Sequence, residues 1–502
     1  MRTLLQHTLL LALPFLGPPV ITQAADAGRV PPNGNTAGAQ TSAAVSFGEI
    51  FVVNSTGDQG DASPGDGQCE TAVGNSVCTL RAAIQEVDAR NNGGDGISFS
   101  IPSTDPGCSN SVCDIALVQS LPAISVAVAI SGPGANVLFI DGGGSPFGVR
   151  VFNVTTSGTV SISGVRITSG VAPSNQNGGG IQNVNAGTVN VTNCLITRNT
   201  AGAGGGTNHG GGGGIFNAGS GTVNVTNCTF EFNQATGLYF TLVAPGGAIY
   251  NKTGFINVTN TTFTSSNSTD SGGAIANEGG IVTVTGSTFH GNGAFNLGGA
   301  ISSRGGTVNI TNSTFYGNIV YGSEESGERG FGGAIANLSS STLNLTNSTV
   351  TANFTGGIGG GVASDNSSGG VANVKSTIIA LNYGARSRFG ESPDVDGLFH
   401  SAGFNLIGKK DGSTGFTAAT DKKGTIASPL NPKLDPKGLR DNGGPTQMVA
   451  LVKGSPAIDK GTSNGLTGTL STDQRGFART VDKAVANASG GDGTDIGAYE
   501  LQ

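Results

Sequence analysis

The densest mixture of charged side chains lies in the stretch "ARSRFGESPDVDG" at 385–397. Its charged members are Arg386, Arg388, Glu391, Asp394 and Asp396. Polysaccharide lyases combine carboxylates that hold Ca²⁺ with a basic residue, and glycoside hydrolases place two carboxylates across the sugar. If the protein is an enzyme, we expect Arg386, Arg388, Asp394 and Asp396 to form such a site. The interpretation that we favour is a loop that joins two parts of the chain.

The rest of the sequence groups no other catalytic or metal-binding residue types. Acidic residues between 178 and 382 do not recur at one position of adjacent repeats. The four His residues and the absence of a Cys-x-x-Cys pair do not complete a zinc set, so we expect no metal and no cofactor. The formal charge is −7, from 25 Lys and Arg against 32 Asp and Glu, so we expect no nucleic-acid partner.

A repeating unit occupies the middle of the chain. Each unit has a glycine pair, an aligned Ile or Val, and an alternating segment such as "GTVNVTNCTF" at 221–230. The aligned residues, spaced 34, 34, 26, 26, 34 and 27 apart, are Ile181, Ile215, Ile249, Ile275, Ile301, Ile335 and Val362. Repeats of this length predict a stacked solenoid.

The fold that this repeat predicts is all-β. Alternating residues such as Val189 and Val191 lie on one side of a strand. One unit cannot close a core, but coils stacked about 4.8 Å apart place like side chains over one another. Connections between parallel strands are nearly always right-handed, so we expect a right-handed parallel β-helix.

Two columns of Asn should stack inside this solenoid, because stacked amides bond one another and Asn tolerates turn geometry. The first column is Asn183, Asn217, Asn251, Asn277 and Asn337. The second is Asn199, Asn233, Ser266, Asn292, Asn318, Asn353 and Asn382. Cys194 and Cys228 share one repeat position, so we expect stacked core thiols, with a bridge between them left open.

Two outer surfaces are candidates for ligand binding. Outward positions such as Asn190 and Thr192 predict a flat, uncharged grid, of the kind that ice-binding solenoids use. Three coils carry long loops, which should wall a trough about 10 Å wide over the shorter coils. Its aromatic and floor residues would be Tyr239, Phe240, Phe295, Asn296, Tyr321 and Phe331. Aromatic loops on a rigid scaffold suit a polysaccharide or cell-surface ligand, although 238–243 could instead form an extra strand.

The N-terminus, "MRTLLQHTLLLALPFLGPPVITQA", has a basic start, an apolar stretch and small residues before a cut after Ala24. We therefore expect a signal peptide and a secreted or cell-surface monomer without a transmembrane segment in the mature chain. In an oxidising compartment, the simplest disulfides join Cys69 to Cys78 and Cys108 to Cys113.

The segment "CTLRAAIQEVDARNNG" at 78–93 predicts a capping helix, with Thr79 as its N-cap and Gly93 and Gly94 at its end. The surrounding residues 51–102 resemble the Cys-Ser-Leu-Arg-Glu-Ala (CSLREA) module of bacterial surface proteins. The C-terminal "GFNLIG", "DNGGPTQMVALVKGSPAIDKG", "TDQRG" and "DIGAYE" resemble the module called choice-of-anchor Q. Only two residues follow Glu500, where many members carry a sorting tail, and this favours secretion.

The resemblance implies an exported bacterial protein with a pectin-lyase-like β-helix, mostly without assigned activity. The expected order is a signal peptide at 1–24, a disordered linker at 25–48, a cap module at 49–102, β-helix repeats at 103–395 and a C-terminal module at 396–502. We expect a non-enzymatic protein in adhesion or in glycan or surface interaction. The alternatives are a polysaccharide lyase or glycoside hydrolase and an ice- or surface-binding solenoid.

Overall fold

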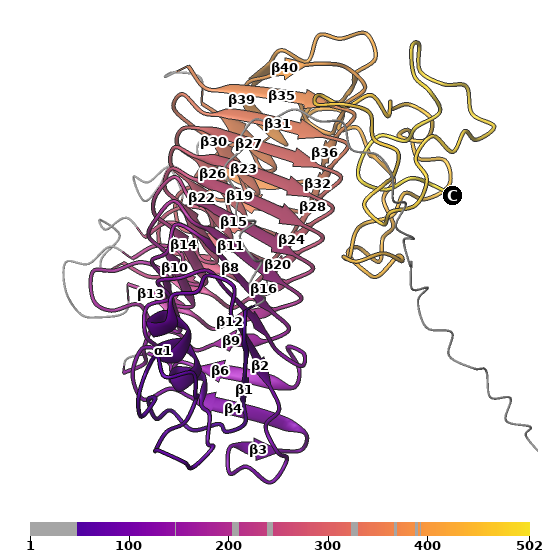
Figure 1. Cartoon of the computed structure of the whole chain (residues 1–502). Coiled ribbons are helices and arrows are strands. Elements are labelled where there is room, and N and C mark those ends of the chain that lie inside the picture. Colours follow the sequence, from indigo (N-terminus) through magenta and orange to yellow (C-terminus); the bar gives the residue numbers. More distant parts are fainter. Residues whose placement is uncertain are drawn as a thin grey trace, which may run out of the picture. The chain divides into compact units, whose positions relative to one another are not determined.

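The computed structural model describes residues 48–145, 147–202, 210–237, 244–322, 330–365, 369–386, 390–391 and 393–502, with the backbone alone at 385–386 and 390–391. Strands from successive coils stack into long sheets, as expected for a parallel β-helix (Figure 1). Each complete coil contributes one strand to each of four sheets, which we call A to D. The pairings are parallel except for β3 with β4 and β37 with β38.

Sheet A contains β1 (Ile50–Val53), β2 (Gly96–Phe99), β5 (Val128–Ser131), β8 (Thr159–Ser163), β11 (Thr188–Thr192), β15 (Thr222–Thr226), β19 (Phe255–Thr259), β23 (Ile281–Thr285), β27 (Thr307–Thr311), β31 (Thr342–Thr346), β35 (Val371–Lys375) and β40 (His400–Ser401). Sheet B contains β3 (Cys108–Ser109), β4 (Val112–Ala116), β6 (Leu138–Asp141), β9 (Arg166–Thr168), β12 (Leu195–Thr197), β16 (Thr229–Glu231), β20 (Thr262–Thr264), β24 (Thr288–His290), β28 (Thr314–Tyr316), β32 (Thr349–Thr351), β36 (Ile378–Ala380), β41 (Leu406–Ile407) and β43 (Lys422–Lys423).

Sheet C contains β7 (Phe152–Val154), β10 (Ile181–Asn183), β14 (Ile215–Asn217), β18 (Ile249–Asn251), β22 (Ile275–Asn277), β26 (Ile301–Ser303), β30 (Ile335–Asn337), β34 (Val362–Ser364), β39 (Val395–Leu398) and β42 (Ser413–Thr414). Sheet D contains β13 (Thr200–Ala201), β17 (Gln234–Ala235), β21 (Asn267–Ser268), β25 (Gly293–Ala294), β29 (Ile319–Val320), β33 (Phe354–Thr355), β37 (Tyr383–Arg386) and β38 (Gly390–Glu391).

The register confirms the alignment predicted from the glycine-led repeat. Each aligned aliphatic residue of sheet C pairs with the next, from Ile181 with Ile215 through Ile335 with Val362. In sheet B the rings of Phe230, Phe263, Phe289 and Phe315 stack, with centroids 4.6–4.8 Å apart. These side chains are fully buried, so one continuous file of apolar groups forms the core.

Helix α1 (Leu80–Arg90) packs beside the first strands of sheet A. The Thr79 side chain caps it by accepting a hydrogen bond from the Ala82 N–H, as predicted. The helix ends before Gly93, because Asn91 takes the left-handed conformation (φ 51°) and its N–H bonds to the Val87 carbonyl. No helix in the described part of the chain has the length and apolarity that a membrane span needs.

The two predicted disulfides are present near this end. Cys69 bonds to Cys78, and Cys108 bonds to Cys113 across the β3–β4 pair. Cys194 and Cys228 are free, buried thiols in adjacent coils. The backbone N–H of Cys194 lies 3.4 Å from the Cys228 sulfur, so the question left open by the sequence resolves in favour of stacked thiols.

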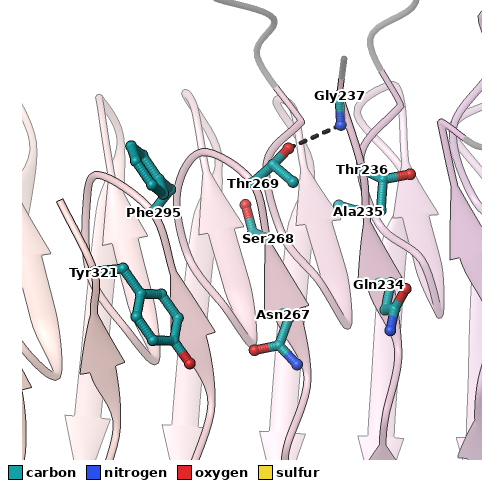
Figure 2. Close-up of a pocket in the computed structure, with 9 residues that line it drawn as sticks. All are labelled: Gln234, Ala235, Thr236, Gly237, Asn267, Ser268, Thr269, Phe295 and Tyr321. Atoms are coloured by element: carbon teal, nitrogen blue, oxygen red, sulfur yellow. Dashed lines mark hydrogen bonds between the residues drawn. The ribbon is translucent and has the colours of Figure 1, made fainter. Parts of the chain in front are cut away.

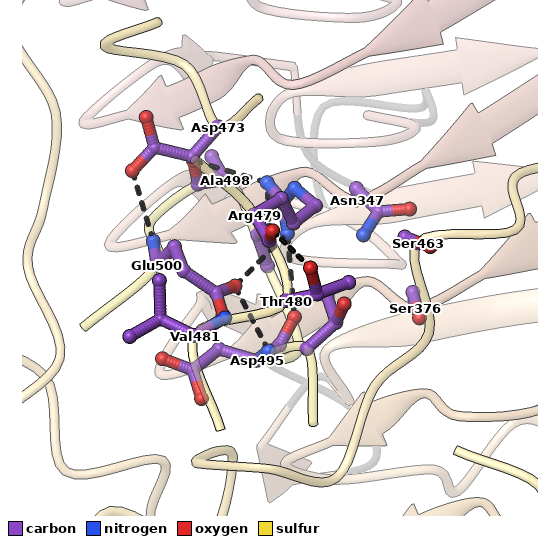
Figure 3. Close-up of polar contacts among 12 residues, drawn as sticks. Asn347, Ser376, Ser463, Asp473, Arg479, Thr480, Val481, Asp495, Ala498 and Glu500 are labelled. Carbon is purple, nitrogen blue, oxygen red and sulfur yellow. Dashed lines mark hydrogen bonds and ion pairs between the residues drawn. The ribbon is translucent and has the colours of Figure 1, made fainter. Parts of the chain in front are cut away.

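After β43 the chain turns back along the outer side of sheet B. Here it has little regular structure, and polar contacts such as that of Asp473 with Glu500 hold it together (Figure 3). Other polar contacts fasten it to coils far earlier in the sequence. Gln474 bonds to Thr288 (3.0 Å) and Thr314 (2.6 Å), and Arg479 donates to the Asn312 side-chain oxygen at 2.9 Å. The C-terminal module therefore covers the side of the solenoid as well as adding coils at its end.

Candidate functional site

The charged stretch at 385–397 does not come together as one described site. Arg386 and Glu391 lie in the hairpin of β37 and β38, where only the backbone is described, and Arg388 lies outside the described residues. Asp396 lies in β39 and is half-buried, whereas Asp394 is fully buried.

The contacts of Asp394 explain its burial. One carboxylate oxygen accepts from the backbone N–H (2.7 Å) and the side-chain amide (3.0 Å) of Asn382, and the other accepts from the Lys409 N–H at 2.7 Å. Burial raises the pKa of Asp394 to about 6. In this structure the side chain closes a polar column in the core, rather than facing a substrate. Within the described residues, no group of three or more His, Cys, Asp or Glu side chains could hold a metal ion.

The predicted Asn columns lie inside the solenoid and are almost fully buried. In the first, the side-chain amides of Asn183, Asn217 and Asn251 each donate to the next Asn at 2.9–3.0 Å. In the second, Asn292, Asn318 and Asn353 do the same at 2.9 Å, and Asn382 donates to Asp394. These residues hold the coils in register and offer no surface to a ligand.

The outer face of sheet A carries the predicted Asn and Thr grid, but its amides are already engaged. Asn224 donates to Asn190, and Asn257 donates to Asn224, each at 2.8 Å. Phe255 is 44% exposed in the neighbouring column, and Thr346 is buried. The grid is therefore interrupted, and its Asn residues have fewer free hydrogen-bonding groups than the sequence suggested.

The most promising hollow lies on the outer side of sheet D (Figure 2). It has a volume of about 530 Å³ and spans neighbouring coils over the shorter loops, where the trough was predicted. Its lining residues are Gln234, Ala235, Thr236, Gly237, Asn267, Ser268, Thr269, Phe295 and Tyr321. We call it the main pocket.

Strand register places the polar groups of the main pocket. Gln234 of β17 pairs with Asn267 of β21, which pairs with Gly293 of β25, so their outward sides form one column. The Thr269 hydroxyl accepts a hydrogen bond from the Gly237 N–H at 2.8 Å, which ties two coils together at the rim. The side chains of Gln234 and Asn267 are exposed. The Asn267 amide donates one hydrogen bond to the Ser265 carbonyl at 3.0 Å, which leaves a second amide hydrogen for a ligand.

Gly293 makes room for the Tyr321 ring. A Cβ at this position would lie 2.5 Å from the Asn267 side-chain oxygen and 3.1 Å from the Tyr321 ring, so a larger residue would displace the Asn267 side chain and shift the ring away from the strand. Figure 2 shows the Tyr321 ring leaning toward Asn267, with Phe295 above it. Tyr321 remains 58% exposed. Its face and hydroxyl are thus accessible beside a row of amides.

The chemistry of the main pocket is uncharged and mixed. Its lining supplies side-chain amides and hydroxyls as donors and acceptors, together with the two aromatic rings of Phe295 and Tyr321. Such a lining fits a ligand that has apolar faces and many hydroxyl groups, since the rings cover the faces and the amides bond the hydroxyls.

The other predicted trough residues lie elsewhere. The Asn296 amide bonds to Asp270 at 3.3 Å, and Phe331 packs against Leu297 and Leu338 instead of lining the main pocket. Tyr239 and Phe240 lie outside the described residues. Sequence reasoning missed Gln234 and Asn267, because two-residue strands give no visible alternation. Their fixed place directly after each member of the second column, Asn233 and Ser266, was the available signal.

A scan against models of known protein families gives no match to this chain, and a comparison with curated proteins gives none.

Proposed function

We propose that this is an exported, non-enzymatic β-helix protein that binds a polysaccharide or another cell-surface glycan through the main pocket. The observation that carries the proposal is the pairing of Tyr321 and Phe295 with exposed amides on a rigid stack of strands. The amides of Gln234 and Asn267 would bond sugar hydroxyls, and the rings would pack on sugar faces. The two disulfides and the expected signal peptide support export.

Retention on immobilised polysaccharides tests the proposal. Purified protein is passed over a panel of plant, fungal and bacterial polysaccharides, and bound protein is measured alongside released sugar. We expect retention without product release, and we expect Tyr321→Ala to weaken retention about tenfold because a stacking face is lost.

Phe255→Ala is the matched control, since Phe255 is an exposed aromatic residue on sheet A. It should leave retention unchanged. Equal retention of wild type and Tyr321→Ala would remove the main pocket from the proposal. Release of reducing or unsaturated ends would replace it with the lyase or hydrolase alternative.

A further inference from the structure

Two pockets lie on the outer side of sheet D, and a third lies where sheet D meets sheet B. We call the outer side of sheet D the sheet D face. Its outward strand positions form one column through consecutive pairings. The column is Thr200, Gln234, Asn267, Gly293, Ile319, Phe354 and Tyr383. At one strand spacing per coil, it extends about 29 Å along the stacking direction. The main pocket occupies its middle.

A second pocket adjoins the main pocket toward the N-terminal coils. It has a volume of about 350 Å³, is lined by Arg198, Thr200, Phe232 and Gln234, and shares Gln234 with the main pocket. Phe232 is 46% exposed, and the Arg198 guanidinium lies 5.5 Å from the centroid of its ring. Residues at this corner take left-handed backbone, which turns these two side chains outward.

A third pocket, of about 300 Å³, lies at the other end of the face. Tyr383 lines it from sheet D, Tyr316 and Thr351 line it from sheet B, and Leu434 and Pro436 line it from the C-terminal module. Tyr383 is 60% exposed, and Phe354, which pairs with it in sheet D, is 39% exposed. Ile319 and Phe354 bridge the interval between this pocket and the main pocket.

Among the described residues that line these pockets, the charged ones lie at the two ends of the sheet D face. Arg198 lies against Phe232 at one end, and Asp435 is paired with Arg440 at 2.5 Å at the other. The main pocket between them has no charged lining residue. A chain with a carboxylate on each sugar would lose hydration there without gaining a cationic partner from the described lining residues, which is unfavourable.

We propose that the ligand is a linear, uncharged polysaccharide that lies along the stacking direction of the coils, from Phe232 to Tyr383. This inference rests on the proposed function and adds the ligand's shape, charge and direction. Phe232, Tyr321, Phe354 and Tyr383 provide sugar-stacking faces at successive distances along the chain, and Gln234 and Asn267 bond hydroxyls between them.

Chain-length dependence tests this inference. The probes are the hexasaccharides and disaccharides of β-1,4-glucan, β-1,4-mannan, β-1,3-glucan and α-1,4-glucan, with hexagalacturonate as the charged counterpart, all measured by calorimetry on the full chain. We expect at least one neutral hexasaccharide to bind about tenfold more tightly than its disaccharide, because it reaches the terminal aromatic residues.

Variants at the two ends separate this inference from the proposed function. Phe232→Ala and Tyr383→Ala should each weaken hexasaccharide binding about three- to tenfold and leave disaccharide binding unchanged. Tyr321→Ala should weaken both. Thermal melts of each variant check that the fold is intact.

Equal affinity for hexasaccharide and disaccharide, or end variants without effect, would overturn the extended ligand and leave the main pocket standing. Tighter binding of hexagalacturonate, or no binding of any neutral hexasaccharide, would also overturn it. Retention on the polysaccharide panel, measured separately, decides the proposed function.

Discussion

Asp394 and Asp421 each end a file of buried polar side chains in which no other member is acidic. The file that ends at Asp421 passes through Ser313, Ser348, Thr377 and Asn405, and in each coil a backbone N–H donates to the side-chain oxygen of the next. A last member has no further coil to donate to. A carboxylate meets this need, because it accepts hydrogen bonds without leaving a donor unpaired.

The first prediction follows from this role of Asp394. In Asp394→Ala, the N–H groups of Asn382 and Lys409 and the Asn382 amide would lose their acceptor inside the core. Each buried orphan costs about 1–3 kcal/mol, so the free energy of unfolding should fall by about 3 kcal/mol or more in urea titrations. The exposed Asp482→Ala serves as the control. Unchanged stability would show that the carboxylate is not structural.

At the scale of the strand and the coil, what the sequence predicted depended on how regularly a residue type repeats. The Ile column and the Phe stack were predictable, because one residue type recurs at one position in several consecutive coils. The file of buried polar side chains that ends at Asp421 was not predictable. Cys, Thr, Ser and Asn alternate there and share only an ability to accept a hydrogen bond. The sheet D strands were too short to show a period, so the trough was predicted from the loops alone. Of its described residues, Phe295 and Tyr321 line the main pocket, whereas Asn296 and Phe331 do not.

The second prediction concerns the aromatic stack of sheet B. Phe289 is fully buried and lies between Phe263 and Phe315, at 4.8 and 4.6 Å from their ring centroids. Phe289→Ala should lower the free energy of unfolding by about 3–5 kcal/mol, because it opens a cavity within a rigid column. Urea denaturation measures the loss. Phe255→Ala, at an exposed position, should cost far less, and an equal cost would argue against the stack as a source of stability.

At the scale of the whole molecule, buried charged residues of the C-terminal module contact one another and the solenoid. Arg479 is fully buried, bonds to Asn312 of the solenoid, and lies 3.7 Å from the Glu500 carboxylate (Figure 3). Burial raises the pKa of Glu500 to about 7, and the nearby Asp495 adds to this effect. The fastening of the module is thus coupled to a group that titrates near neutral pH.

The third prediction is a pH dependence of stability. The folded protein holds the Glu500 proton to about pH 7, whereas the unfolded chain releases it near its usual value of 4.5. The contribution to stability is therefore fully present below about pH 4.5 and is lost as the pH rises through about 7. Gln cannot ionise, so Tm should fall less steeply over this range in Glu500→Gln than in wild type. Parallel Tm profiles in the two proteins would contradict the assignment.

The C-terminal module, which covers the outer side of sheet B, also bears on the order in which parts of the chain fold. The Asn-to-Asn bonds of the two columns join residues 26 to 35 positions apart, whereas the bonds of Gln474 reach back as far as 187 positions. Short closures form sooner than long ones. A chain that emerges N-terminus first can therefore wind its coils one upon another as they appear. The contacts between the C-terminal module and sheet B can form only after the last residues are available. A chain truncated before them would therefore form the stacked coils without these contacts.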